Sequence, residues 1–238
     1  MKHRLATLAA IPLATVAVVV SLAGCPAPPP TCDRCCKTGF VGDRAQPLQL
    51  EIVSIGQDLV VHPVDACGSL DIIKPPQGGK VLFIGVRATN LDGCGIELKA
   101  TLRDVTSRAS LGGEIRTVNL IPIANRPGWV EANSEGDFEN VGFSSFANVA
   151  VCPNHNVVDI QRQAHILEVK VTDKGGRTAT ASAMVIPRCR QHDPVALAEC
   201  ECTCEANDNG DKCGDLGAWE VGDAGVFDAG ACSSDAAH

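Results

Sequence analysis

Residues 165–185 read HILEVKVTDKGGRTATASAMV, and this stretch decides the fold class. Every second residue forms one face of each half: His165, Leu167, Val169 and Val171 before the turn, and Ala179, Ala181, Ala183 and Val185 after it. A period of two residues is the signature of a half-buried strand. Gly175 and Gly176 allow the positive φ angles of a tight turn between the halves. The stretch therefore predicts a β-hairpin with one face in a hydrophobic core.

The same alternation recurs upstream along the chain. The predicted strands lie at 48–53, at 81–88 with Leu82, Ile84, Val86 and Ala88 on one face, at 96–103 with Ile96, Leu98, Ala100 and Leu102 on one face, and at 148–152. Val118 and Leu120 begin a further strand that Pro122 interrupts. Helical periodicity is almost absent from residues 48–187. We therefore expect an all-β fold, an antiparallel β-sandwich of roughly seven strands.

The hairpin also carries a family resemblance. LEVKVTDKGGRTATASAMVIP, residues 167–187, resembles the last hairpin of bacterial immunoglobulin-like and PKD-like extracellular domains, and residues 80–103 add weaker support. The resemblance implies an immunoglobulin-like sandwich over residues 48–187. Trp129 follows Arg-Pro-Gly and is predicted to lie in a loop, so the central-strand tryptophan of immunoglobulin domains has no counterpart.

The N-terminus has the layout of an export signal. Lys2 and Arg4 precede an apolar run, and small residues then lead to a cysteine in Leu22-Ala23-Gly24-Cys25. This tetrapeptide resembles the lipobox of bacterial lipoproteins, which implies a signal peptide at 1–24 and acylation of Cys25. Pro26, in place of the aspartate that retains such proteins in the inner membrane, implies an outer-membrane location. The alternatives are an ordinary secreted protein cleaved nearby, or a cysteine that is at this position by chance.

Cysteine counting agrees with export. The chain has 13 cysteines, and assigning Cys25 to lipid leaves 12, an even number that an oxidising compartment can pair. The disulfide candidates are Cys32, Cys35, Cys36, Cys67, Cys94, Cys152, Cys189, Cys200, Cys202, Cys204, Cys213 and Cys232. Spacing does not give the pairing. As a working hypothesis, Cys67, Cys94, Cys152 and Cys189 join within the sandwich, and the other eight form a knot that brings both flanking segments to one edge.

The flanking segments differ from the sandwich in composition. Residues 25–47 begin with the proline-rich PAPPPTCDRCC, typical of an extended stalk behind a lipid anchor. Residues 188–238 are predicted to be a Cys-rich segment and an acidic, low-complexity tail. One short helix is expected after Asp193, which caps it, with Pro194 at its first position. Both extensions are otherwise predicted to be mostly irregular.

Two groups of residues are candidate metal sites, and each has a simpler interpretation. Cys32-x-x-Cys35-Cys36 and the Cys200, Cys202, Cys204 and Cys213 group contain zinc ligands, but only one C-x-x-C is present, so disulfides are favoured. Asp208, Asp211 and Asp215 lie in an Asn-Asp-Asn-Gly-Asp context that loosely resembles calcium loops. The acids do not alternate fully, so a solvated acidic loop is favoured and no cofactor is expected.

The remaining side chains give little support to catalysis. The sequence lacks a Gly-x-Ser-x-Gly elbow, a His-Glu-x-x-His helix, a phosphate-binding glycine loop and a Ser-x-x-Lys pair. His165 is expected to be packed, and His155 is the more accessible loop histidine. Trp129, Phe138 and Phe143 could form a binding patch together with Phe146, although closing one end of the core is the favoured role.

These features predict a non-enzymatic, lipid-anchored protein of the cell envelope. Removing Lys2 and Arg4 with the signal takes the formal charge from −8 to −10, which disfavours nucleic acid as a partner. The expected partners are the membrane, through the lipid, and a protein of the envelope. The alternative is an envelope enzyme or metal-dependent accessory protein that uses the Cys-rich C-terminal segment.

Overall fold

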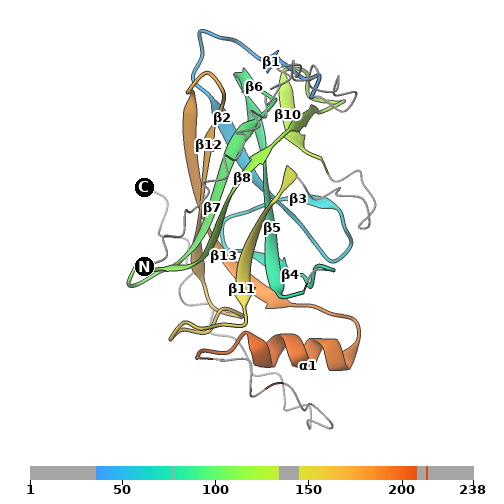
Figure 1. Cartoon of the computed structure of the whole chain (residues 1–238), viewed down its shortest axis with the longest axis vertical. Coiled ribbons are helices and arrows are strands. Elements are labelled where there is room, and N and C mark those ends of the chain that lie inside the picture. The colour runs from blue at the N-terminus through green and yellow to red at the C-terminus, as the bar shows by residue number, and fades with distance from the viewer. Residues whose placement is uncertain (1–35, 77, 134–144, 208–212, 214–238) are drawn as a thin grey trace, which may run out of the picture. The chain divides into compact units, whose positions relative to one another are not determined.

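The computed structural model describes residues 36–76, 78–133, 145–207 and 213, and these form an all-β fold with one helix (Figure 1). The elements are β1 (Phe40–Val41), β2 (Gln49–Ile55), β3 (Val61–Pro63), β4 (Gly68–Ile72), β5 (Lys80–Thr89), β6 (Leu91–Asp92), β7 (Ile96–Asp104), β8 (Ser110–Val118), β9 (Leu120–Pro122), β10 (Trp129–Ala132), β11 (Ala147–Cys152), β12 (His165–Thr172), β13 (Thr178–Cys189) and α1 (Pro194–Thr203).

Two larger sheets enclose the core. The six-stranded sheet has the order β3-β2-β5-β10-β9, with β11 also paired to β5, and the five-stranded sheet has the order β4-β13-β12-β7-β8. The pairings are antiparallel, as predicted, except that β4 runs parallel to β13. Beyond β4, Ile73 forms an antiparallel bridge with Val81 of β5, so the chain leaves one sheet and joins the other at this edge. Buried residues of both sheets form a single hydrophobic cluster.

The predicted hairpin is confirmed. In β12 and β13, Leu167 lies opposite Ala183 and Val171 opposite Ala179, and β7 pairs with the other edge of β12. Leu167, Val169 and Val171 are fully buried, while the alanines of β13 are half-buried. The period of two residues therefore identified the correct face of both strands.

The predicted strand at 81–88 is confirmed as a central strand. β5 pairs with β2 along one edge and with β10 and β11 along the other. The opposite face of β5 is also covered, because the Phe146 ring lies against Gly85. A Cβ atom at Gly85 would be 2.7 Å from that ring and 2.7 Å from the Ala132 methyl group. Glycine at this position therefore lets a large aromatic side chain pack directly on the strand backbone.

The prediction of a single strand that begins with Val118 and Leu120 was wrong. Val118 ends β8 and lies opposite Ile96 in the five-stranded sheet, whereas Leu120 begins β9 and lies opposite Ala132 in the six-stranded sheet. Both side chains are buried because the chain crosses between the sheets at Asn119. The amide oxygen of Asn119 accepts a hydrogen bond from the Gly95 N–H at 2.8 Å. Alternation alone cannot distinguish one strand from two that share a core.

β5 and β12 run between two ends of this body. The β1 end comprises β1, β6 and the 173–176 turn, and the helix end comprises α1 and the loop 153–164 (Figure 1). β5 begins beside α1 at Lys80 and reaches the β1 end at Thr89, so its 10 residues separate the ends by about 30 Å. Within the described residues, no helix is long and apolar enough to cross a membrane.

Candidate functional site: the disulfide-anchored helix

Helix α1 begins as its sequence predicts. The Asp193 carboxylate accepts a hydrogen bond from the Ala196 N–H at 2.8 Å, and Pro194 occupies the first turn, where a missing N–H costs nothing. The helix ends at Cys204, whose N–H donates to the Cys200 carbonyl at 3.2 Å. The expected short helix and its capping residue are confirmed.

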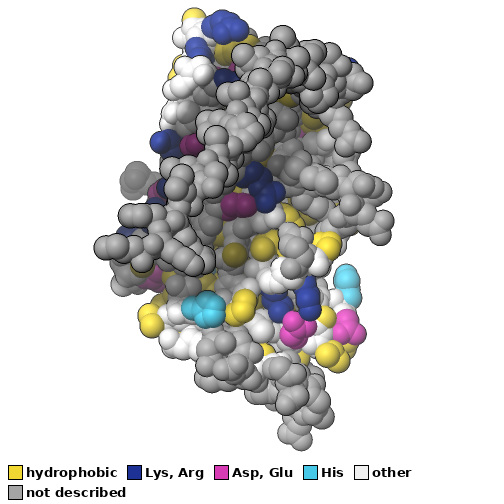
Figure 2. All heavy atoms as spheres, viewed as in Figure 1, with side chains coloured by type: hydrophobic (Ala, Val, Ile, Leu, Met, Phe, Trp, Pro, Cys, Tyr) yellow, Lys and Arg dark blue, Asp and Glu magenta, His cyan; other side chains and the backbone are white. Residues whose placement is uncertain are grey.

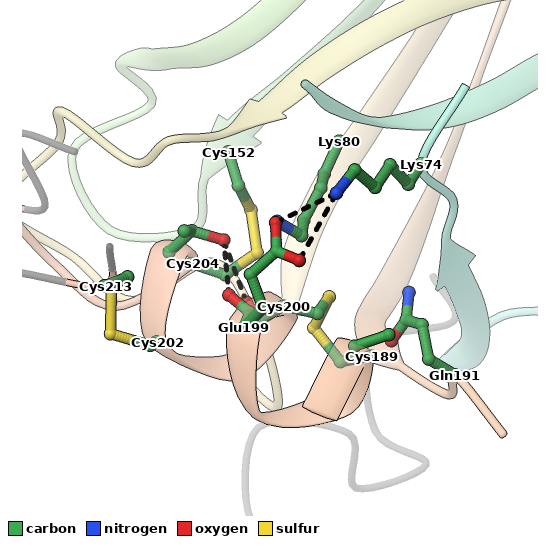
Figure 3. A network of polar contacts seen from close by, with 12 residues as sticks. Lys74, Lys80, Cys152, Cys189, Gln191, Glu199, Cys200, Cys202, Cys204 and Cys213 are labelled. Atoms are coloured by element: carbon green, nitrogen blue, oxygen red, sulfur yellow. Dashed lines mark hydrogen bonds and ion pairs between the residues drawn. A yellow bond between two sulfur atoms is a disulfide. The ribbon is translucent and has the colours of Figure 1, made fainter. Parts of the chain in front are cut away.

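Apolar burial contributes little to holding this helix. Cys200 is its only fully buried residue, and Val195 is 64% exposed. Three disulfides act on α1 instead: Cys189–Cys200, Cys152–Cys204 at the C-cap, and Cys202–Cys213 (Figure 3). The first two link the helix to the ends of β13 and β11. Covalent bonds thus replace the apolar face that usually docks a helix.

The predicted disulfide pairing is wrong. Cys94, Cys152 and Cys189 do not join one another; each links the β-sheet body to a flanking segment, through Cys36, Cys204 and Cys200. Cys67 is also disulfide-bonded. Cys36–Cys94 lies at the β1 end and the helix disulfides lie at the other, so the described disulfides do not bring Cys36 and α1 to one edge as expected. Spacing carries no information on which strand end lies beside which segment.

The disulfide state itself was expected. Cys36, Cys200, Cys202, Cys204 and Cys213 are all in disulfides. Cys25, Cys32, Cys35 and Cys232 lie outside the described residues. The calcium candidates Asp208, Asp211 and Asp215 lie outside them as well.

A charge network joins α1 to the six-stranded sheet. The Glu199 carboxylate accepts hydrogen bonds from Lys80 Nζ at 3.0 Å and from Lys74 Nζ at 3.2 Å (Figure 3). The Lys80 side chain is only 6% exposed, compared with 55% for Lys74 and 35% for Glu199. The hydrogen bond from Lys80 holds the pKa of Glu199 below its usual value, although burial acts in the opposite direction. Glu199 is therefore the ionised partner of a buried lysine.

Backbone acceptors near the C-terminus of α1 are satisfied by the 153–164 loop. Asn154 Nδ2 donates to the Cys204 carbonyl at 3.2 Å and Gln161 Nε2 to the Glu201 carbonyl at 3.1 Å. The Asn154 N–H donates to the Thr203 carbonyl at 2.9 Å, and Arg162 pairs with the Glu201 carboxylate. These contacts fix the last turn independently of the disulfides.

Sequence reasoning missed this network. Lys80 is separated from Glu199 by 119 residues, and neither lies in a recognisable motif. The one available signal was a lysine at the start of an otherwise apolar strand, because a buried lysine requires a partner. Basic and acidic side chains also lie side by side near the helix end of the face seen in Figure 2, so charge there is mixed in sign.

The aromatic binding candidates are distributed differently from the prediction. Trp129 is not in a loop; it begins β10, opposite Thr89, and is half-buried. The Arg126 guanidinium carbon lies 3.4 Å from the centre of the Trp129 ring, and the same guanidinium donates twice to Glu51 at 2.7 Å. Phe138 and Phe143 lie outside the described residues. Phe146 is fully buried and so has the core role that was favoured.

The two histidines singled out from the sequence, His165 and His155, differ in burial. His165 is 1% exposed, and its Nε2 lies 2.9 Å from the Ile160 carbonyl oxygen. Burial lowers the pKa of His165, although the Ile160 carbonyl and Asp104 act in the opposite direction. The expectation that His165 is packed is confirmed. His155 is exposed in the 153–164 loop.

Neither a scan of the chain against protein-family models nor a search of curated proteins found a match. Function must therefore be argued from the chain itself.

Proposed function

We propose that this chain is a lipid-anchored protein of the cell envelope whose immunoglobulin-like sandwich acts as a structural or protein-binding module. The observation that carries the proposal is the lipobox Leu22-Ala23-Gly24-Cys25 directly after an apolar export segment. Acyl chains on Cys25 would hold the protein in the membrane, and Pro26 favours the outer membrane. Two or more chains suffice for stable attachment.

The arrangement of the two ends supports display as the mechanism. Cys36, bonded to Cys94 at the β1 end, follows Cys25 by only ten intervening residues. In an extended polyproline conformation, a spacer of this length reaches about 30 Å. The lipid anchor would then be joined to the folded body through Cys36, at the β1 end.

The immunoglobulin-like assignment is part of the same proposal. It is supported by two mainly antiparallel sheets around one core and by the β12–β13 hairpin, which carries the sequence resemblance. We also propose that the module has no catalytic role, because the sequence lacks the common catalytic motifs and His165 is buried as a packing residue.

The decisive experiment is Cys25→Ser in a bacterial host that acylates lipoproteins. The unaltered chain should label with palmitate and partition with membranes, whereas Cys25→Ser should lose the label and become soluble in the periplasm. Cys36→Ser/Cys94→Ser is the matched control, because it removes two other cysteines and should keep the label. A Cys25→Ser protein that still fractionates with membranes would overturn the proposal.

A further inference from the structure

Two of the helix disulfides bring four cysteines into one buried cluster. The Sγ atoms of Cys189, Cys200 and Cys204 all lie within 4.8 Å of one another, and Cys204 is bonded to Cys152. Cys200 and Cys204 are fully buried, Cys152 is 4% exposed and Cys189 is half-buried. We call these four residues the sulfur cluster.

The positions of the four residues do not depend on the disulfides alone. Cys200 and Cys204 are four residues apart and therefore lie on the same face of α1. Cys152 and Cys189 end strands that are paired in their sheets, opposite Lys80 and Ile72.

Noncovalent contacts hold the helix against β5 and the 153–164 loop. They are the Glu199–Lys80 pair at 3.0 Å, the Gln161–Glu201 hydrogen bond at 3.1 Å and the Asn154–Cys204 hydrogen bond at 3.2 Å. We expect these contacts to keep the helix beside β11 and β13 when the disulfides are opened, so that the four cysteines stay near one another.

Four converging thiolates are the ligand set of a structural zinc site. With a Zn–S distance of 2.3 Å, tetrahedral sulfurs lie about 3.8 Å apart. The sulfurs of Cys189, Cys200 and Cys204 lie within 4.8 Å of one another, and Cys152 is bonded to Cys204. Once reduced, each formerly bonded pair would have to separate by about 2 Å to reach this spacing. An all-sulfur set selects soft ions such as Zn²⁺ or Cu⁺ over Ca²⁺ or Mg²⁺. The tetrathiolate would also have cations nearby, because Figure 3 shows Lys74 and Lys80 on the side of α1 where the Cys152–Cys204 disulfide lies.

We propose that Cys152, Cys189, Cys200 and Cys204, when reduced, form a tetrahedral four-thiolate site for Zn²⁺. In the reduction, two dithiol molecules give four electrons and four protons to the two disulfides and become disulfides themselves. Binding then displaces four protons, leaving four thiolates on one Zn²⁺. Either the metal or the disulfides would attach the same helix to the strands. An oxidant that re-forms the disulfides would release the ion. This inference is independent of lipid anchoring.

The test compares two disulfides of equal span. Cys189–Cys200 belongs to the sulfur cluster and Cys202–Cys213 does not, and both have a sequence separation of 11. The purified full chain is reduced with dithiothreitol, which is then removed without oxygen, and Co²⁺ is added as a spectroscopic substitute for Zn²⁺. We expect a thiolate-to-cobalt charge-transfer band that saturates at one ion per chain. Cys189→Ser/Cys200→Ser should abolish the band, and Cys202→Ser/Cys213→Ser should retain it.

A second measurement uses the unaltered chain, so it does not depend on whether the variants fold. The reduced chain is alkylated with iodoacetamide, with and without Zn²⁺, and the labelled cysteines are located by peptide mapping. Zn²⁺ should slow alkylation at least tenfold at the four sulfur-cluster cysteines and leave Cys202 and Cys213 reactive. The proposal is overturned if protection falls on other cysteines or if both double variants lose the cobalt band equally. It is also overturned if the reduced chain stays folded without binding Co²⁺, or unfolds in spite of added Zn²⁺.

Discussion

The two ends of the molecule attach their flanking segments by different means. At the β1 end, Phe40 and Val41 pair with β6, the Thr38 hydroxyl donates to the Leu120 carbonyl, and one disulfide adds to this backbone pairing. At the helix end, α1 buries one residue completely and is held by three disulfides, by the Glu199 carboxylate and by hydrogen bonds from the 153–164 loop to its last turn. A segment that completes a sheet gains hydrogen bonds along its length. A short helix with no apolar face must be held by covalent bonds and charge.

The largest effects on stability should come from removing a disulfide at either end, in two separate double variants. Cys36–Cys94 spans 58 residues and Cys189–Cys200 spans 11. In the chain-entropy model the first stabilises the fold by about 4 kcal/mol and the second by about 3 kcal/mol. We expect Cys36→Ser/Cys94→Ser to lower the free energy of global unfolding in urea. Cys189→Ser/Cys200→Ser should act mainly through faster hydrogen exchange in α1. If the amides of α1 exchanged equally fast in the two double variants, the two ends would not be energetically distinct.

The core between the ends should respond to overpacking. Gly85→Ala places a methyl group 2.7 Å from the Phe146 ring, which is too close without a shift of β5 or of the ring. We expect a loss of about 1–3 kcal/mol in the free energy of unfolding, measured by urea denaturation. The same substitution in a Phe146→Leu background should cost less, because the smaller side chain leaves room for the methyl group. Additive losses would contradict direct contact as the cause.

Regular alternation allowed the central part of the fold to be predicted from the sequence. Ile96, Leu98, Ala100 and Leu102 are all fully buried on one face of β7, and Asp193 and Pro194 gave the start of α1. β8 was missed, because Gly112 and Gly113 interrupt any apolar pattern. An added Cβ at Gly112 would lie 2.2 Å from the Ala150 carbonyl oxygen of β11, so this glycine reflects a tertiary contact. The pairing of Cys152 with Cys204 and of Lys80 with Glu199 is likewise tertiary, and local sequence carries no trace of either partner.

The charge network at the helix end should contribute less than the disulfides. Glu199→Gln leaves Lys80, 6% exposed, without its ionised partner. We expect a loss of about 1–2 kcal/mol, less than for a fully buried pair because Glu199 is 35% exposed. Lys74→Ala is the matched control. It removes the other lysine of the network, which is 55% exposed, and should cost less than about 1 kcal/mol. A larger loss for Lys74→Ala than for Glu199→Gln would contradict this order.

The Glu199–Lys80 pair makes the stability of the fold depend on pH in the acidic range. Because its pKa is lowered from 4.5 in the folded chain, Glu199 stabilises the fold fully above about pH 4.5. This contribution is lost as the pH falls through the lowered pKa, since both states then bind the proton. Urea denaturation at a series of pH values should show a smaller loss between pH 5 and pH 3 for Glu199→Gln than for the unaltered chain.

The smallest effect should come from His165, which begins β12 at the helix end. Its pKa is lowered from 6.5 by burial, so below about pH 6.5 the unfolded chain binds a proton that the folded chain does not yet bind. Stability should therefore decrease as the pH falls from 6.5 through the lowered pKa. Asp104 partly offsets the decrease, because it favours the protonated ring. His165→Gln should remove this slope near pH 6 and leave the Glu199 response at lower pH intact. A slope near pH 6 that survives the substitution would assign it to another group.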